Sequence, residues 1–257
     1  MEEIVREGDT VLVLINEKRK FVARVERGKM LGTDKGYIPH DQLVGIPYGS
    51  VVKTSAGVPA FILKPLRQDY FAWLRRATQV IYPKDAAFMI YLSGIGPGSK
   101  VGEAGVGTGA LSVAITSIIG DEGILYGFDI SDRALECVKE NLEKAGLRHR
   151  AVLLKHDVRL GINVEPLDAF FLDIPDPWNA ITSVNRVLKP SAPILVYVPT
   201  INQVEKTVLA MCESKMFTDI HAYELLLREY LVNPGAVRPR TKMIGHTGYV
   251  IFARKVL

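Results

Sequence analysis

Short apolar runs alternate with longer amphipathic runs between residues 100 and 215. Short apolar runs bounded by glycine or polar residues predict buried strands, whereas apolar residues that recur every three to four positions predict helices. The predicted strands are 100–104, 123–128, 151–155, 169–172 and 193–198, and the predicted helices are 109–119, 131–145, 179–188 and 202–215. This alternation predicts βαβ units and an α/β fold with a parallel sheet.

The pattern changes on both sides of this core. After residue 215, two β-rich runs, 218–231 and 248–255, flank a segment rich in proline and arginine. We interpret them as an antiparallel pair that ends the sheet. Before residue 100, amphipathic spacing predicts a helix at 69–77, and Pro83 can open a second helix over 84–92 because proline suits the first helical position.

Residues 1–64 show a third pattern, in which glycines separate short alternating runs. These runs, at 10–15, 21–25, 37–38, 50–52 and 60–63, predict the strands of a small β-barrel-like domain. Pro65 forces Lys64 into an extended conformation and stops the last strand, so we place the domain boundary there, between 1–64 and 65–257. Modules of this kind bind oligonucleotides or serve in packing and oligomerisation, and the sequence leaves both roles open.

Length, charge and cysteine content limit the class of protein but do not identify a binding partner. The chain has 257 residues, 48% of them hydrophobic, which suffices for an α/β core and a small second domain. A net charge of +4 is too mild to argue for nucleic acid by itself. There is no apolar segment of about 18 residues and no signal-peptide pattern, so we expect a cytoplasmic protein. Cys137 and Cys212 fall in helical patterns without metal-ligand spacing, which favours buried thiols and no metal.

The most informative stretch is 101–109, Val-Gly-Glu-Ala-Gly-Val-Gly-Thr-Gly, which runs from a strand through a tight turn into a helix. Its glycines allow positive φ and close approach of a ligand to the main chain. The dinucleotide fingerprint G-x-G-x-x-G leaves amides free for a pyrophosphate, whereas here the glycines alternate and Glu103 ends the strand. A carboxylate there repels a pyrophosphate and attracts an ammonium, so an NAD oxidoreductase is the weakest alternative. With Asp129 twenty positions after Gly109, the stretch resembles the first motif of class I methyltransferases that use S-adenosylmethionine.

Acidic residues follow four successive predicted strands, and in open parallel sheets ligands bind at these strand ends. Asp129 can accept hydrogen bonds from both ribose hydroxyls, and Asp157 can accept a hydrogen bond from the exocyclic amine of the cofactor's adenine. Glu103 and Asp173 can lie near the methionine ammonium and the methyl donor. The expected cofactor-binding residues are Gln79, Glu103, Gly105, Val106, Gly107, Thr108, Gly109, Asp129, Ile130, His156, Asp157 and Asp173.

The segment 173–178, Asp-Ile-Pro-Asp-Pro-Trp, carries the expected acceptor site. It resembles the Asp-Pro-Pro-Tyr type of sequence with which amino-methylating enzymes hold a flipped base, stretched by one residue. Prolines lower the entropy of ordering such a turn. We expect Asp173 to be a catalytic residue that accepts a hydrogen bond from the amine of the base. Tyr82 is expected to be a second catalytic residue, and Trp178 is expected to border the base.

A wider set of motifs resembles one family. Asp69-Tyr70, 79–85, 103–105, 173–178 and 245–249 are together similar to the tRNA (adenine-N1)-methyltransferases, over essentially the whole chain. The resemblance implies a class I, Rossmann-like domain with a small N-terminal β domain. It also implies S-adenosylmethionine as cofactor, tRNA as partner and a homotetramer of the archaeal or bacterial kind. The implied product is 1-methyladenosine in the T loop, at position 58 with position 57 as a second candidate.

Basic residues between the last two predicted strands are candidates for phosphate contacts. They comprise Arg238, Arg240 and His246, with Lys242 beside them. Arg67, Arg75 and Arg76 in the entry helix form a second group, although such a run is commonly a solvated face.

Two alternatives stay open. A methyltransferase of the same fold acting on protein carboxylates or a small molecule would share the cofactor residues and differ in the acceptor pocket. A non-catalytic tRNA-binding subunit would be expected to have eroded cofactor motifs, and the motif residues here are intact.

Overall fold

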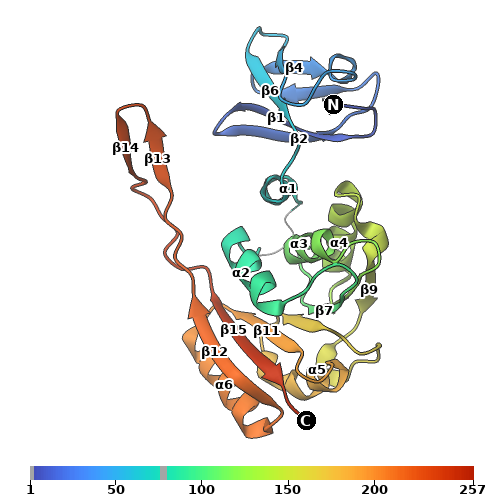
Figure 1. The fold of residues 1–257 in the computed structure, drawn as a ribbon, viewed down its shortest axis with the longest axis vertical. Helices are drawn as coiled ribbons and strands as arrows, with labels where there is room; N and C mark the ends of the chain where they lie inside the picture. Colours follow the sequence, from blue (N-terminus) through green and yellow to red (C-terminus); the bar gives the residue numbers. More distant parts are fainter. Residues whose placement is uncertain (1–2, 76–79) are drawn as a thin grey trace. The chain divides into compact units, whose positions relative to one another are not determined.

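The computed structural model describes residues 3–75 and 80–257, and the chain divides into two compact units, Met1–Leu74 and Arg75–Leu257. Figure 1 shows the elements of both units in sequence colours. The domain boundary predicted between 1–64 and 65–257 stays a prediction. No helix in the described part of the chain is long and apolar enough to cross a membrane.

The first unit is built on a small antiparallel sheet, which confirms the predicted N-terminal β domain. The sheet has the order β2-β1-β6-β5, and a separate hairpin pairs β3 with β4. The elements are β1 (Thr10–Asn16), β2 (Arg19–Arg24), β3 (Met30–Thr33), β4 (Gly36–Pro39), η1 (His40–Gln42), β5 (Val51–Lys53), β6 (Pro59–Leu63) and α1 (Arg67–Trp73). Alternate residues of β1, such as Val11 and Val13, pack with Ile38 and Ile62 in a core of their own. The hairpin strand β3 was not predicted, because its sequence has no clear alternation.

The second unit contains a seven-stranded sheet with the order β12-β15-β11-β10-β7-β8-β9. Its strands are β7 (Lys100–Ala104), β8 (Ile124–Asp129), β9 (Ala151–Lys155), β10 (Ala169–Leu172), β11 (Pro193–Val198), β12 (Phe217–Glu224) and β15 (Tyr249–Lys255). The five strands from β7 to β11 are parallel, and β15 and β12 complete the sheet as the predicted antiparallel pair. Chain order reverses between β7 and β10, because β8 and β9 extend the sheet on one side and β11 on the other. Ligands bind at such a switch point.

Helices connect the strands close to the predicted positions. They are α2 (Pro83–Ser93), α3 (Ala110–Ile119), α4 (Asp132–Lys144), η2 (Arg148–Arg150), η3 (Val158–Leu160), η4 (Pro177–Asn179), α5 (Ile181–Val187) and α6 (Ile201–Ser214). Pro83 is the first residue of α2, as expected. Ser131 caps α4 by accepting a hydrogen bond from the amide of Ala134, and Gly146 follows the helix with a φ of 71°.

Three expectations need correction. The run 218–231 is not one strand: β12 ends at Glu224, and β13 (Tyr230–Asn233) pairs with β14 (Ala236–Pro239) in a hairpin separate from the large sheet (Figure 1). The turn Pro234-Gly235, in which Gly235 has a φ of 75°, supplies the reversal. The helix expected at 179–188 begins as a 3-10 turn before α5. Cys212 is exposed on α6, whereas Cys137 is buried as predicted.

The strand β7 lies in a tightly packed part of the core. A Cβ atom added at Gly102 would lie 2.4 Å and 2.5 Å from two ring atoms of the fully buried Phe170 on the neighbouring strand β10. Glycine at this position therefore lets the aromatic ring pack directly against the β7 backbone.

We predict that Gly102→Ala lowers the free energy of unfolding by about 1–3 kcal/mol, because the extra methyl group overpacks the core. Gly96→Ala is the matched control, since a Cβ at Gly96 meets nothing within 4 Å and its φ is not positive. Urea unfolding of the two variants measures the difference. Equal midpoints for both would contradict this description of the core.

Candidate functional site

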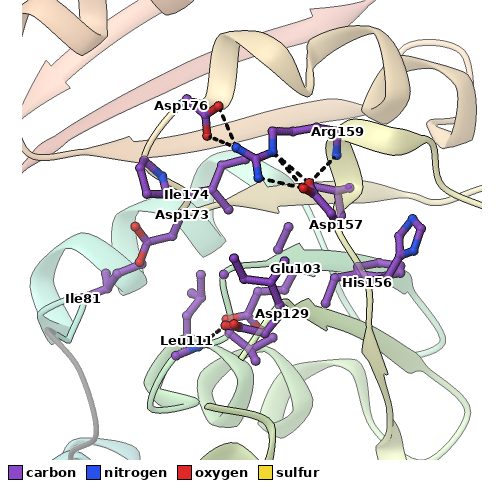
Figure 2. Close-up of a pocket in the computed structure, with 18 of the residues that line it drawn as sticks. Ile81, Glu103, Leu111, Asp129, His156, Asp157, Arg159, Asp173, Ile174 and Asp176 are labelled. Carbon is purple, nitrogen blue, oxygen red and sulfur yellow. Dashed lines mark hydrogen bonds and ion pairs between the residues drawn. The ribbon is translucent and has the colours of Figure 1, made fainter. Parts of the chain in front are cut away.

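A cavity of about 660 Å³ opens at the carboxyl ends of β7, β8, β9 and β10 (Figure 2). Most of the expected cofactor residues line it, together with residues of the acceptor segment. The lining residues are Ile81, Glu103, Ala104, Gly105, Val106, Gly107, Thr108, Ala110, Leu111, Phe128, Asp129, Ile130, His156, Asp157, Val158, Arg159, Asp173, Ile174, Pro175, Asp176, Pro199 and Gln203. The parallel strands thus bring the four acidic strand ends together, as the fold predicts.

The glycine turn brings two strand ends into direct contact. Gly105 has a φ of 81°, and a Cβ atom there would lie 1.8 Å from the carbonyl oxygen of Asp173. The amide of Asp173 donates a hydrogen bond to the carbonyl of Ala104 at 2.8 Å, and the amide of Gly105 donates to the carbonyl of Phe128 at 2.9 Å. A side chain at position 105 would push the two strand ends apart, so the turn has to present bare backbone.

The Glu103 carboxyl is buried at the end of β7, with 2% of the residue exposed. The hydroxyl of Ser112 on α3 donates a hydrogen bond to its Oε2 at 2.6 Å. Burial raises the pKa of Glu103 to about 8, although the Ser112 hydrogen bond works in the opposite direction. A carboxylate in such a place is costly without a cation, so the site is suited to bind an ammonium group.

Asp129 ends β8 with its carboxylate held by two amides. The amide of Gly107 donates to Oδ2 at 3.2 Å, and the amide of Ser131 donates to Oδ1 at 2.9 Å. Each oxygen keeps acceptor capacity, which suits a pair of vicinal hydroxyls. Ile130, the next residue, is exposed and lines the cavity beside it.

Asp173 follows β10 and faces the cavity (Figure 2). Burial, and to a smaller extent the charge of Asp129, raises the pKa of its carboxyl to about 7. The segment after it is held in place by Gln203 on α6, whose Nε2 donates to the carbonyl of Pro175 at 2.8 Å. A carboxyl whose charge changes near neutral pH is typical of functional sites.

Arg159 is a pocket residue that the sequence analysis missed. Its guanidinium forms ion pairs with Asp157 at 2.7 Å and with Asp176 at 2.8 Å. The hydrogen bond from Arg159 is the main cause that lowers the pKa of Asp157. His156 also lines the cavity, and its ring makes an edge contact with Phe128 at a centroid distance of 6.3 Å.

Several predicted residues lie outside the cavity lining. Tyr82 precedes α2 and is 38% exposed, and Trp178 lies beneath the Nζ of Lys206, 5.1 Å from its ring centroid. Arg238 lies on β14, and Arg240 forms an ion pair with Glu229 at 2.8 Å. Gln79 falls outside the described residues. The roles expected for these side chains stay predictions.

His246 is held next to the cavity by two contacts. Its Nδ1 lies 2.7 Å from Oε1 of Glu224, and its Nε2 lies 2.7 Å from the carbonyl of Pro199, a pocket residue. The contact with Glu224, and secondly that with Pro199, raises the pKa of His246. The structure thus uses His246 to join β12 to the loop after β11.

A buried ion pair lies at the start of α2. Asp85 is fully buried at the start of α2, and its Oδ1 lies 2.7 Å from Nζ of Lys84. The Thr247 hydroxyl donates to Oδ2 of Asp85 at 2.7 Å and accepts a hydrogen bond from Lys84 at 2.7 Å. Two motifs far apart in the sequence, 79–85 and 245–249, therefore meet here. In the described part of the chain, no cluster of His, Cys, Asp and Glu side chains is arranged to hold a metal ion.

Comparison with known families gives two matches. The model described as the GCD14 subunit of the tRNA methyltransferase complex matches residues 60–236, which is more than half of the chain. The model described as the TrmI-like N-terminal domain matches residues 4–52. Together they match parts of both units of the structure.

Individual relatives match over nearly their whole length. The tRNA (adenine(57)-N(1)/adenine(58)-N(1))-methyltransferase TrmI of Methanocaldococcus jannaschii is 31% identical over 94% of this chain and 94% of its own. The structure of tRNA (m1A58) methyltransferase TrmI from Aquifex aeolicus has a TM-score of 0.83 and 26% identity, covering 99% of this chain and all of that one. A structure from Thermotoga maritima, described as a SAM-dependent O-methyltransferase, has a TM-score of 0.89 and 32% identity, covering 98% of this chain and 95% of that one.

Proposed function

The chain belongs to the TrmI and GCD14 family of tRNA (adenine-N1)-methyltransferases, and from this premise we propose how its strand-end cavity carries out the reaction. The enzyme transfers the methyl group of S-adenosylmethionine to N1 of adenine in tRNA. We propose that it does so in the cytoplasm and at position 58, which the M. jannaschii and A. aeolicus relatives have in common. Position 57, named for the M. jannaschii relative, is the second candidate site.

The residues of the cavity fit S-adenosylmethionine. Glu103 is a buried carboxyl without a basic partner among the described residues, and it would accept the ammonium of the methionine part. The glycine turn lets the ligand approach bare backbone, and Asp129 would accept the ribose hydroxyls. Asp157 would accept the adenine amine. When bound, the cofactor supplies an electrophilic methyl group on a sulfonium.

Asp173 carries the proposed acceptor chemistry. Adenine N1 has an in-plane lone pair, so its methylation needs no prior loss of a proton, and the ring becomes cationic. The ionised Asp173 would accept a hydrogen bond from the 6-amino group and stabilise the charge that develops on the ring. Because this interaction strengthens as the charge develops, it favours the transition state over the ground state. The single observation that carries this assignment is the position of Asp173 in the cavity, in direct backbone contact with the glycine turn.

The likeness to the T. maritima structure favours one alternative, transfer of the methyl group to an oxygen. A hydroxyl acceptor has to lose a proton during the reaction, and Asp173, with its pKa near 7, would then act as a general base. The adenine reaction is favoured because both matched families and the two TrmI relatives point to tRNA. A non-catalytic subunit is disfavoured by the intact cavity.

The tRNA has to be bound by surfaces beyond the cavity, because N1 is hidden in the paired or stacked base until the base is extruded. We propose that Arg238 and Arg240, near the end of the β13–β14 hairpin, contact phosphates together with His246, and that Trp178 and Tyr82 border the extruded base. The domain formed by residues 1–64 is proposed to assist RNA binding, and residues 65–257 to carry the catalytic domain.

We further propose a homotetramer. The hairpin exposes apolar side chains that a lone chain would leave in water, among them Tyr230, Val232 and Val237, which are 52%, 71% and 65% exposed. Contiguous exposed apolar surface is typical of interfaces. Light scattering on the purified chain measures the oligomeric state directly.

The function is tested by nucleoside analysis of unmodified tRNA treated with the enzyme and S-adenosylmethionine. We expect 1-methyladenosine, mapped to position 58 by primer-extension arrest, and no methylated ribose or protein. The control is a tRNA with guanine at position 58. This tRNA has no adenine to methylate at 58, so any 1-methyladenosine in the T loop would have to lie at position 57. Methylation of an oxygen in place of N1 would contradict the proposed function.

We predict that kcat/KM for tRNA, measured at saturating S-adenosylmethionine, rises with pH up to about 7 and then levels off, because Asp173 is protonated below its raised pKa and ionised above it. Asp173→Asn should lower kcat about 100-fold to 1000-fold and remove this rise, since the amide carries no charge to stabilise the cationic ring. tRNA binding, measured by filter retention, should stay within about threefold, which is less than 1 kcal/mol. If the rise near pH 7 persisted in Asp173→Asn, the pH dependence would come from a group other than Asp173, which would contradict this assignment.

A further inference from the structure

Arg159 joins two loops that follow different strands of the sheet (Figure 2). Its Nε and Nη2 donate to Oδ1 and Oδ2 of Asp157 at 2.8 Å and 2.7 Å. Its Nη1 lies 2.9 Å and 2.8 Å from Oδ1 and Oδ2 of Asp176. Such a two-sided contact uses the planar fork of the guanidinium, which a lysine cannot reproduce.

The two partners of Arg159 lie on different sides of the cavity, one beside the proposed cofactor site and one beside the proposed site of the target adenosine. Asp157 follows β9 and is the proposed acceptor of the cofactor's adenine amine. Asp176 lies three residues after Asp173 in the segment 173–178, which we name the acceptor loop. Arg159 therefore connects the cofactor side of the cavity to the acceptor side. The assignment of these two sides rests on the proposed function.

The hydrogen bonds of Asp176 show that it anchors the loop. Its Oδ2 accepts from Arg159 and also from Nδ2 of Asn179, at 2.8 Å each. Burial favours the neutral acid, but the hydrogen bonds from Asn179 and Arg159 outweigh it and lower the pKa of Asp176. Of the two carboxylates in the acceptor loop, Asp176 is thus engaged within the protein, whereas that of Asp173 faces the cavity.

Asp157 can serve Arg159 and the cofactor together. Its Oδ1 accepts from the amide and from Nε of Arg159, at 3.0 Å and 2.8 Å. Its Oδ2 accepts a short hydrogen bond from Nη2 and a longer one, at 3.1 Å, from Nε. The Nε–H is shared between the two oxygens, so three donors, the amide, Nε and Nη2, meet the roughly four acceptor positions of a carboxylate, and one position remains for a donor such as an amine.

Several contacts tie the acceptor loop to the rest of the unit, among them the contact of Lys206 on α6 with the Trp178 ring. Its first residue is held by the amide of Asp173 on the carbonyl of Ala104, and its middle by Gln203 on the carbonyl of Pro175. The contact between Arg159 and Asp176 ties its far half to the cofactor side. Pro175 and Pro177 restrict the backbone of the loop on both sides of Asp176.

We propose that Arg159 is a positioning residue that couples cofactor binding to binding of the target adenosine. By holding Asp176, it sets the acceptor loop at a fixed distance from the cofactor-binding Asp157. A ligand on Asp157 fixes Arg159, and Arg159 in turn fixes the loop that receives the base. Cofactor and tRNA therefore bind more tightly together than apart, as linkage between two sites requires.

A purely structural ion pair would give a different result. The side chains of Arg159, Asp157 and Asp176 are 36%, 24% and 22% exposed, and partly exposed ion pairs contribute little to stability. Loss of Arg159 should therefore leave the thermal unfolding temperature nearly unchanged. The effect should appear in the coupling between the two ligands.

The test uses four variants of the full chain, Arg159→Gln, Arg159→Lys, Asp176→Asn and the double variant Arg159→Gln/Asp176→Asn. Asp121→Asn is the matched control, because Asp121 pairs with Arg150 at 2.6 Å at the opposite end of β9 from the cavity. For each protein we would measure the Kd of S-adenosylhomocysteine by calorimetry and the Kd of unmodified tRNA with and without saturating S-adenosylhomocysteine. Methyl transfer under single-turnover conditions gives the rate.

In the unaltered enzyme we expect S-adenosylhomocysteine to tighten tRNA binding about fivefold or more, the lower end of usual coupling between sites. Asp176→Asn should keep its affinity for S-adenosylhomocysteine within about twofold, which is below 1 kcal/mol, yet lose the tightening of tRNA binding and most of the transfer rate. Arg159→Gln should lose the coupling and also bind S-adenosylhomocysteine more weakly. The double variant should transfer no more slowly than Arg159→Gln, because contacting residues are not additive. Arg159→Lys should restore little, and Asp121→Asn should match the unaltered enzyme.

The inference is overturned if Asp176→Asn keeps the coupling and the rate, or if the losses in the two single variants add in the double variant. It is also overturned if the unaltered enzyme shows no coupling. These outcomes are distinct from failure of the proposed function, in which the unaltered enzyme would form no 1-methyladenosine under the same conditions.

Discussion

A carboxyl group buried without a basic partner is the constraint on which the site depends. Glu103 lies at the end of β7, 2% exposed, with the Ser112 hydroxyl as its hydrogen-bond donor in the described part of the chain. Burial raises its pKa to about 8, so without a compensating cation the neutral acid is favoured near pH 7. Such a group lowers stability unless something compensates it, and an ammonium group of a ligand does so. The position therefore selects a cationic cofactor over a pyrophosphate.

The contact between the glycine turn and β10 joins this cofactor site to the acceptor. Because the backbone of Gly105 lies against the carbonyl of Asp173, the residue that follows β10 has to lie beside the turn that is proposed to hold the methyl donor. The two carboxyls then differ by their surroundings. Glu103 is enclosed beneath the turn, whereas Asp173 faces the cavity with a pKa of about 7. One carboxyl suits a fixed cation, and the other suits a base whose charge appears during the reaction.

The sequence pattern predicted the sheet well and the contacts between loops poorly. Buried parallel strands such as β10 and β11 are short apolar runs, and four acidic ends meet because parallel strands end at one edge. Arg159 was missed because its two partners, two and seventeen residues away, are brought together only by the folded loops. The β13–β14 hairpin was missed because the run 218–231 looks like one strand until Pro234-Gly235 is recognised as a turn. The exposure of Cys212 depends on which face α6 buries.

The most direct test of the central claim is the number of protons released when S-adenosylhomocysteine binds at pH 7. Titration calorimetry in two buffers with different ionisation enthalpies measures this number. With the pKa of Glu103 at about 8 in the protein alone, binding of the ligand's ammonium should release close to one proton from the unaltered enzyme and none from Glu103→Gln. No release from the unaltered enzyme, or equal release from both proteins, would contradict the claim that the buried Glu103 pairs with the cofactor.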